Sequence, residues 1–278
     1  MSLPLASPSR PSLYAAPRVL PHAAHALSGL WRLTARRFFT PSHWMILAGM
    51  LVLLAIFSIP AAPDSAAAAD GLLPWAAGFY VCFLLPIFAF ISSASAMRDS
   101  FGAATVDYVF TRPIRRPAFV VFRYLIQMVC TQIDFLFSFA VIVGLGIYHG
   151  VPGLWSALPT LLLGQVMAVV VFSAFGTACG ALTSRYVIVG LVYAGIVEVG
   201  LGNVPTQINQ ISLVRQVLGI LRPVIGEHGD PLARLASIAS LSPAGIVALL
   251  LGVSLVLVAL SALVFALQEF TGAAGRDA

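Results

Sequence analysis

The sequence predicts an all-α polytopic membrane protein with six transmembrane helices, an N-terminal interfacial helix and short external helices before the last span. Its 278 residues are 60% hydrophobic and 9% charged, with a mean hydropathy of +0.98, whereas soluble domains carry about 25% charged residues. Runs without formal charge extend over Phe38–Pro63, Gly71–Met97 and Leu235–Gln268. Since about 20 apolar residues in a helix cross a bilayer, and hydrocarbon forces the backbone to pair internally, each run is long enough for a helical span.

The N-terminal region is predicted to lie outside the membrane core. Residues 1–21, rich in Pro, Ser and Ala, are predicted to form a disordered cytoplasmic tail. Residues 22–41 form a predicted amphipathic helix with Arg32, Arg36 and Arg37 as its cations and aromatic and aliphatic anchors beside them. Such a helix lies at the membrane surface.

Six spans follow along the chain. They are predicted at residues 42–60, 72–97, 118–148, 154–183, 186–203 and 243–267. The stretch His149–Gly153 is a predicted tight turn, whereas residues 98–117 and 204–242 are longer connections. Residues 269–278 form a tail, and no segment is polar and long enough for a second, soluble domain. Residues 42–268 are therefore expected to form one transmembrane domain.

The distribution of arginines predicts the orientation in the membrane. The chain has 15 arginines and no lysine. With a cytoplasmic N-terminus, twelve arginines fall on the cytoplasmic side and three, all within 204–242, fall outside, as the positive-inside rule requires. Both termini and the 98–117 loop are then cytoplasmic. The use of arginine without lysine, together with abundant alanine, suggests a GC-rich bacterial genome. The expected location is the bacterial inner (cytoplasmic) membrane.

The 98–117 loop has the pattern of a docking element. Asp99 or Ser100 can cap a helix start, and the following residues place apolar and aromatic side chains, Tyr108 among them, on one helical face. Thr111-Arg112-Pro113 ends this helix, and further arginines follow. A short helix with aromatic side chains and flanking arginines fits a groove on a soluble partner. The alternative is that the arginines only set the topology.

Four polar residues share one face of the predicted third span, namely Gln127, Thr131, Asp134 and Ser138. A charge at mid-membrane costs about 2.5–3.5 kcal/mol on insertion scales, so this face is expected to point away from lipid. It either lines a transport path or forms hydrogen bonds between helices. The sequence leaves both alternatives open.

Two stripes of small residues predict close helix contacts. The stripe on the fifth span contains Gly190, Ala194, Glu198 and Gly202, and the stripe on the fourth contains Gly176, Gly180 and Ser184. Glu198 is therefore expected in a helix contact near the external end, in a structural or gating role. The fourth-span stripe predicts packing in the core, with a dimer face as the alternative.

The 204–242 connection contains an amphipathic segment. Its predicted apolar helical face is formed by Val214, Val217, Leu218, Leu221 and Ile225. Arg215 and Arg222 are expected on the other side of this helix. A second, weaker amphipathic piece, PLARLASIASLS, follows the GEHGDP break. The alternative is an ordinary interfacial loop.

The stretch RDSFGAATVDYVFTRPIRRPAFVVFRYL resembles the cytoplasmic loop of ABC-2 type permeases, the membrane subunits of one class of ABC transporter. The family pattern is an acidic residue, a nearby glycine, a short helix and P-[IV]-[SR]-R, here Asp99, Gly102 and Pro113 to Arg116. The family often has Glu at the first position and Ser where this chain has Arg115. A second patch, YAGIVEVGLGNVPTQINQISLVRQVLGIL, is similar to the family through Glu198 and Gly202-Asn203-Val204-Pro205. The resemblance covers most of the chain from residue 28.

The resemblance implies a division of labour between chains. Two permease chains, identical or different, would pair, and separate P-loop ATPase subunits would bind their cytoplasmic loops. The resemblance assigns ATPase coupling to Asp99, Phe101, Gly102, Thr105, Tyr108, Arg112, Pro113, Arg115 and Arg116. It assigns an external gate to Asn203, Pro205, Arg215 and Arg222.

We therefore expect the membrane-spanning permease subunit of an ATP-driven exporter. Without lysine the chain cannot form a phosphate-binding P-loop, so ATP and Mg are expected on the partner ATPase, with no catalytic, cofactor or metal site in this chain. Binding of nucleic acid is not expected. The apolar spans favour a lipid-like or amphiphilic cargo. The alternatives are a membrane subunit that serves maturation or extraction of an envelope component, and an intramembrane enzyme that uses Asp134 and Glu198.

Overall fold

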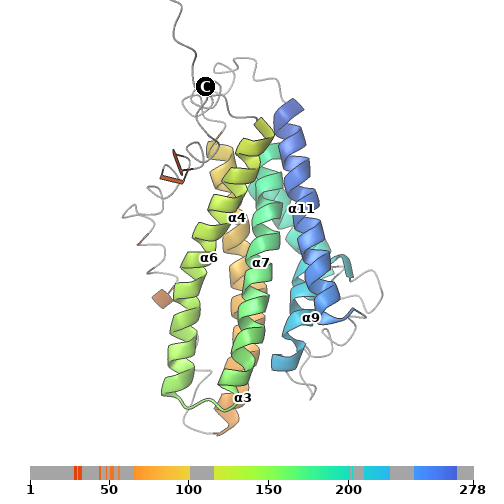
Figure 1. The fold of residues 1–278 in the computed structure, drawn as a ribbon. Helices are drawn as coiled ribbons and strands as arrows, with labels where there is room; N and C mark the ends of the chain where they lie inside the picture. The colour runs from red at the N-terminus through yellow and green to blue at the C-terminus, as the bar shows by residue number, and fades with distance from the viewer. Residues whose placement is uncertain are drawn as a thin grey trace, which may run out of the picture.

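The computed structural model describes residues 66–100, 116–200, 202, 210–225 and 241–267, together with a few single residues between 28 and 56. These described residues are 93% helical and contain no strand. Long helices run side by side along one axis (Figure 1). The predicted all-α fold class is confirmed at this level.

Four helices are long and apolar enough to cross a membrane within the described part of the chain. They are Gly71–Asp99, Arg116–Tyr148, Leu154–Leu182 and Pro243–Leu267. They agree with four of the predicted spans to within two residues at either end. The predicted first span, 42–60, lies almost wholly outside the described residues, as do the tails 1–21 and 269–278 and most of the 22–41 helix.

The first of the four is a continuous helix with a wider middle. It consists of α3 (Ala66–Trp75), the π-helix η1 (Ala76–Leu84) and α4 (Leu85–Asp99). Pro86 is the second residue after the π-helical stretch. We attribute the wider turns to this proline, which has no N–H to donate and whose ring would clash with the Cys82 carbonyl in a regular α-helix.

Helices α6 (Arg116–Tyr148) and α7 (Leu154–Leu182) form an antiparallel pair. The predicted turn between them is confirmed. Gly150 and Gly153 have φ angles of 63° and 75°, a left-handed conformation that glycine adopts without steric cost.

Helix α7 is the centre of the bundle. It contacts α4, α6, α8, α9, α11 and η1. A Cβ atom on Gly176 or Gly180 would collide with the backbone carbonyls of Phe90 and Ala94 on α4. Gly176 and Gly180 of the predicted fourth-span stripe therefore pack inside the chain, whereas Ser184, the third member, is exposed in the turn after α7.

The fifth predicted span, 186–203, corresponds to α8 (Tyr186–Tyr193) and the π-helix η2 (Ala194–Gly200). At about 1.5 Å per residue these 15 residues reach roughly 22 Å, which is short of a bilayer core of about 30 Å. The segment is apolar, and neither element has a buried residue. It lies on the surface of the bundle.

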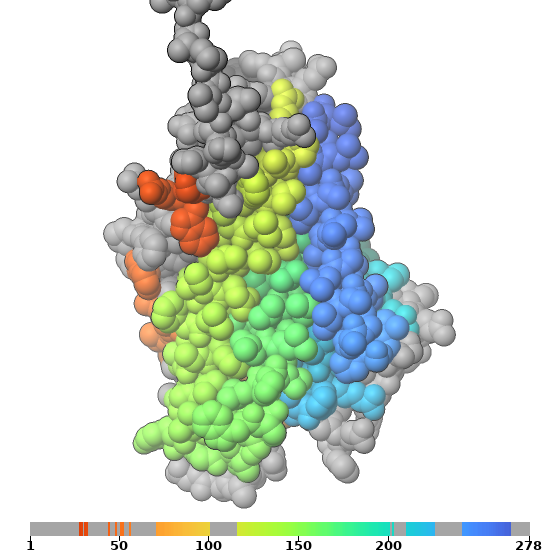
Figure 2. Space-filling model, in the orientation of Figure 1, coloured from red at the N-terminus to blue at the C-terminus, as the bar shows by residue number. Residues whose placement is uncertain are grey.

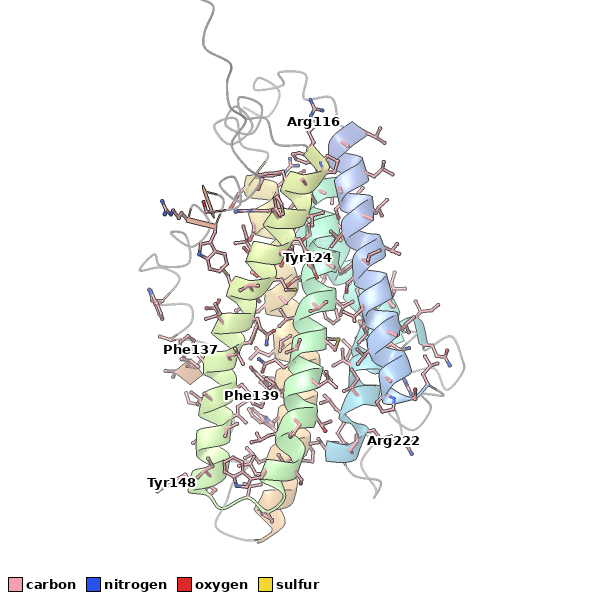
Figure 3. The ribbon with its side chains drawn as sticks, viewed as in Figure 1. Arg116, Tyr124, Phe137, Phe139, Tyr148 and Arg222 are labelled. Carbon is pink, nitrogen blue, oxygen red and sulfur yellow. The ribbon has the colours of Figure 1, made fainter. Side chains whose placement is uncertain are left out.

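The remaining helices are α9 (Leu213–Ile225) and α11 (Pro243–Leu267). Arg116 and Tyr148 lie at opposite ends of the bundle, and Arg222 lies toward the end that holds Tyr148 (Figure 3). Because the helices alternate in direction, the arginine-rich connection leaves one end of the bundle, and α9 lies toward the other.

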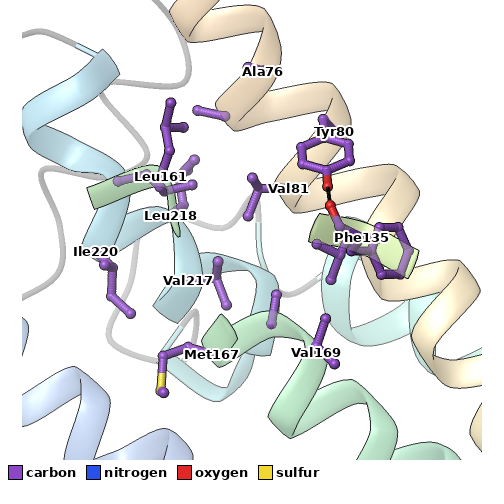
Figure 4. Packing of buried hydrophobic residues seen from close by; sticks show 14 of the residues in the cluster. Ala76, Tyr80, Val81, Phe135, Leu161, Met167, Val169, Val217, Leu218 and Ile220 are labelled. Atoms are coloured by element: carbon purple, nitrogen blue, oxygen red, sulfur yellow. Dashed lines mark hydrogen bonds between the residues drawn. The ribbon is translucent and has the colours of Figure 1, made fainter. Parts of the chain in front are cut away.

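The main hydrophobic core joins η1, α4, α6, α7, α9 and α11. Figure 4 shows Leu218 and Val217 of α9 beside Leu161 of α7. Outside this core, exposed apolar side chains cover α6 and α11, which lie beside α7 on the face shown in Figure 2. Such an apolar surface on helices of bilayer length fits contact with lipid.

Candidate functional site: a carboxylate at a helix start and an apolar cavity

The Glu198 carboxylate in η2 lies at the N-terminus of α9. Its Oε1 accepts hydrogen bonds from the Tyr193 hydroxyl at 2.6 Å and the Leu213 N–H at 3.1 Å. Its Oε2 accepts from the Ser212 hydroxyl, and from the Val214 N–H at 3.3 Å. A helix N-terminus presents unpaired N–H groups and a partial positive charge, so it stabilises a carboxylate. Glu198 therefore anchors α9, in agreement with the structural role expected for it.

Ser212 completes this junction. Its Oγ donates to Glu198 and accepts from the Arg215 N–H at 3.1 Å, the geometry of an N-cap. The sequence analysis did not single out Ser212, although a serine directly before an amphipathic helix is an N-cap signal.

Arg215 is also part of this junction. Sequence analysis expected it on the side of α9 away from the apolar face, beside Arg222. Arg222 is exposed, but Arg215 is buried, and its guanidinium donates to the Gly202 carbonyl. Burial lowers the pKa of Arg215, although a guanidinium stays charged near neutral pH. Arg215 thus ties α9 to Gly202, while Asn203 and Pro205 of the expected gate lie outside the described residues.

The rest of the fifth-span stripe also faces the bundle. A Cβ atom on Gly190 would collide with the Phe90 ring of α4. Ala194 and Glu198 line a cavity beside it. The prediction of a close helix contact is confirmed at Gly190.

The cavity has a volume of about 440 Å³ and lies between η1 and α4, α7, and α8 and η2. Phe172 of α7 forms part of its inner wall and is 4% exposed. Phe83, Ile87 and Leu191 line it as well, and they are 56%, 41% and 74% exposed at the bundle surface. Its walls are almost wholly apolar. The cavity was not predicted, because a stripe of small residues shows that helices approach but not where they diverge.

On the third predicted span, the polar face joins two helices. Gln127 Nε2 donates to Ser92 Oγ of α4 at 3.2 Å, and Thr131 Oγ1 lies 3.2 Å from the same oxygen. Ser138 instead donates to the Asp134 carbonyl within α6, at 3.2 Å. For Gln127 and Thr131 the geometry supports the alternative of interhelical hydrogen bonds. The partly buried Asp134 lies on this helix with the role of its carboxylate open.

A second polar contact crosses the bundle at Tyr80, in η1. Its hydroxyl lies 2.8 Å from the Phe135 carbonyl of α6 (Figure 4). The same hydroxyl lies 3.0 Å from Gln165 Oε1 of α7. Tyr80 and Gln165 are both buried. Sequence analysis missed this contact, for which a tyrosine and a glutamine within apolar spans were the only signals.

The flanks of the arginine-rich loop are held together. Asp99 ends α4, and Ser100 donates from its hydroxyl to the Ala96 carbonyl at 3.0 Å, so it closes this helix. Nη2 of Arg123, which is buried in α6, donates to the same carbonyl at 3.2 Å. A cation at the carbonyl end of a helix is favourable. Arg123 is the sixth residue of the predicted 118–148 span, and this position was the signal for its burial.

Most of the proposed coupling residues cannot be placed. Asp99 and Arg116 flank the loop at the ends of α4 and α6. Phe101, Gly102, Thr105, Tyr108, Arg112, Pro113 and Arg115 lie outside the described residues.

Cys82, Cys130 and Cys179 are free thiols within η1, α6 and α7. In the described parts of the chain, no cluster of three or more His, Cys, Asp or Glu residues could hold a metal ion.

No protein-family model matches the chain, and no curated protein matches it as a relative.

Proposed function

We propose that this chain is the membrane-spanning permease subunit of an ATP-driven exporter, coupled to separate ATPase subunits through residues 98–117. It lies in the bacterial inner membrane with both termini in the cytoplasm and pairs with a second permease chain. ATP and Mg bind to the partner ATPase, since a chain without lysine cannot form a P-loop.

The observation that carries this proposal is how the arginine-rich loop joins the bundle. Its first flank, α4, and its second flank, α6, are held together by Arg123 at Ala96 and by Gln127 at Ser92. Helix α4 in turn packs against the glycines of α7. A partner that moves the loop would therefore move the two long helices α4 and α6 together. A loop that only sets the topology would not need such a firm connection between its two flanking helices.

The opposite end offers the element that would respond. Helix α9 is bound to the α8–η2 segment, which lies on the bundle surface, through Glu198, and to the neighbouring Gly202 through Arg215. In an export cycle, movement of this segment relative to α7 would open or close that end. All four acceptor positions of the Glu198 carboxylate are used within the junction, which favours a mechanical role over intramembrane catalysis.

The test is to purify the tagged chain in mild detergent from its own membrane and to identify the proteins that accompany it. The loop variant is Tyr108→Asp/Arg115→Ala/Arg116→Ala. The matched control, Tyr148→Asp/Arg222→Ala, changes exposed residues toward the opposite end. We expect a P-loop ATPase with the wild type and with the control but not with the loop variant. Absence of an ATPase from the wild type, even after crosslinking, would contradict the proposal.

A further inference from the structure

We propose that the cavity between α4, α7 and α8 binds the hydrocarbon chain of an amphiphile that enters sideways from the bilayer. The proposal that the cavity binds hydrocarbon is argued from the cavity alone. The proposal that the bound amphiphile is the exported substrate rests on the proposed transport function.

The opening of the cavity determines where its occupant comes from. Phe83 and Ile87 border it on one side and Leu191 and Val199 on the other, and all four are exposed on the flank of the bundle. Phe83 and Ile87 belong to a helix long and apolar enough to cross a membrane, and Leu191 and Val199 belong to the shorter apolar segment Tyr186–Gly200 beside it. The cavity is therefore continuous with the surface that faces lipid, and a hydrocarbon chain reaches it without crossing water.

The inner wall determines the chemistry of the occupant. Phe172 and Phe175 of α7 and Phe90 of α4 line it with aromatic carbon. A volume of about 440 Å³ lies within the range of small-molecule sites, about 300–1,000 Å³. A wall without free polar groups selects against sugars and ions and favours hydrocarbon.

The ends of the cavity determine the direction of the chain. Ile91 lies toward the arginine-rich end and Cys82 toward α9, and the nine steps along the helix from one to the other span roughly 13 Å. The polar side chains of the lining, Tyr193 and Glu198, lie with Cys82 toward α9. The polar head of the amphiphile therefore points toward the α9 end, and its chain runs toward Ile91.

This placement links the site to the mobile part of the proposed mechanism. One wall of the cavity is α8 and η2, and Glu198 of η2 holds the start of α9. A hydrocarbon chain bound in the cavity would contact α8 and η2 directly and so would change their position relative to α4 and α7. Occupancy of the cavity and the position of α9 are then coupled through one carboxylate.

The experiment uses the full chain in phosphatidylcholine vesicles that contain phosphatidylcholine with a photoreactive diazirine in one acyl chain. After illumination, labelled residues are identified by mass spectrometry. We expect label on Phe172, which lipid on the outer surface of the bundle cannot reach, in addition to the exposed Ile87 and Leu191. Label on exposed residues alone would overturn the proposal.

A pair of variants on one short segment gives the matched comparison. Ala194→Phe places a ring in the cavity, whereas Val192→Phe places the same ring on an exposed residue outside the lining. We expect Ala194→Phe to reduce labelling of Phe172 at least fivefold, with labelling of Ile133 on the exposed face of α6 unchanged. Val192→Phe should leave both unchanged. Equal labelling of Phe172 in the two variants would refute the site.

The labelling needs no ATPase, so its result is separate from that of the purification experiment. If Phe172 is not labelled but an ATPase accompanies the chain, the transport proposal stands and this site fails. If Phe172 is labelled but no ATPase is found, the lipid site stands without a role in transport.

Discussion

Glu198 shows how a single residue can hold a segment in place within an apolar protein. A carboxylate is costly in a low-dielectric environment unless donors surround it. Here the donors are the tyrosine and serine hydroxyls of its own neighbourhood and the first N–H groups of α9. The same contacts satisfy N–H groups that would otherwise lack partners at the helix start.

We predict that Glu198→Gln lowers the free energy of unfolding by about 1–3 kcal/mol, because charge-assisted hydrogen bonds to the helix N-terminus are replaced by weaker ones. Amide exchange should rise in 213–225 and stay unchanged in α6. The measurement is hydrogen exchange of the purified chain in detergent, with exposed Arg222→Ala as the control. Unchanged exchange in α9 would show that Glu198 does not anchor it.

Arg123 is the corresponding residue at the other end of the bundle. We predict that Arg123→Met, which keeps much of the apolar stem, destabilises the fold by about 1–3 kcal/mol, because the Ala96 carbonyl loses a charged donor. Exchange should rise at the end of α4. Arg185→Met, on an exposed arginine, should change neither quantity, and equal effects of the two variants would refute this role for Arg123.

At the scale of helices, glycine positions determine how closely elements approach. Gly176 and Gly180 allow α7 to lie against the backbone of α4, whereas Gly144 on α6 has open space around it. Close backbone approach through small residues is a principal source of packing between membrane helices. The contact between α4 and α7 is therefore the part of the fold most sensitive to added volume.

We predict that Gly176→Ala destabilises the fold by about 1–3 kcal/mol, because its methyl group collides with the Phe90 carbonyl. Gly144→Ala, with no atom within 4 Å of the added Cβ, should be neutral or stabilising by up to about 1 kcal/mol. Unfolding titrations in mixed detergent compare the two. If Gly176→Ala is as stable as Gly144→Ala, the close approach of α4 and α7 is wrong.

For the whole molecule, charge-free runs and arginine positions predicted the four described spans well, because hydrocarbon leaves few alternatives to a helix. The amphipathic pattern of residues 213–225 could not show that α9 packs into the core. An apolar helical face indicates burial, but it does not indicate whether lipid or protein covers that face. The burial of Arg215 follows from that packing, so the helical pattern alone placed it wrongly.

The contacts across the bundle were harder to predict than the helices. Tyr80, Phe135 and Gln165 meet only because three helices have particular rotations about their axes, and a single sequence does not fix these rotations. The face with Gln127 and Thr131 was predicted from its period, but its partner Ser92 was not. The cavity depends on how η1, α4, α7, α8 and η2 are placed around it, which no local pattern records.

The proposed coupling to an ATPase is the central claim for the whole molecule, and site-specific photocrosslinking in native membranes tests it most directly. A photoreactive amino acid is placed at position 108 in the arginine-rich loop or, as the control, at position 148 at the opposite end of the bundle. We predict a crosslink to a P-loop ATPase from position 108 and none from position 148. Crosslinks from position 148 alone, or from neither position, would contradict the account.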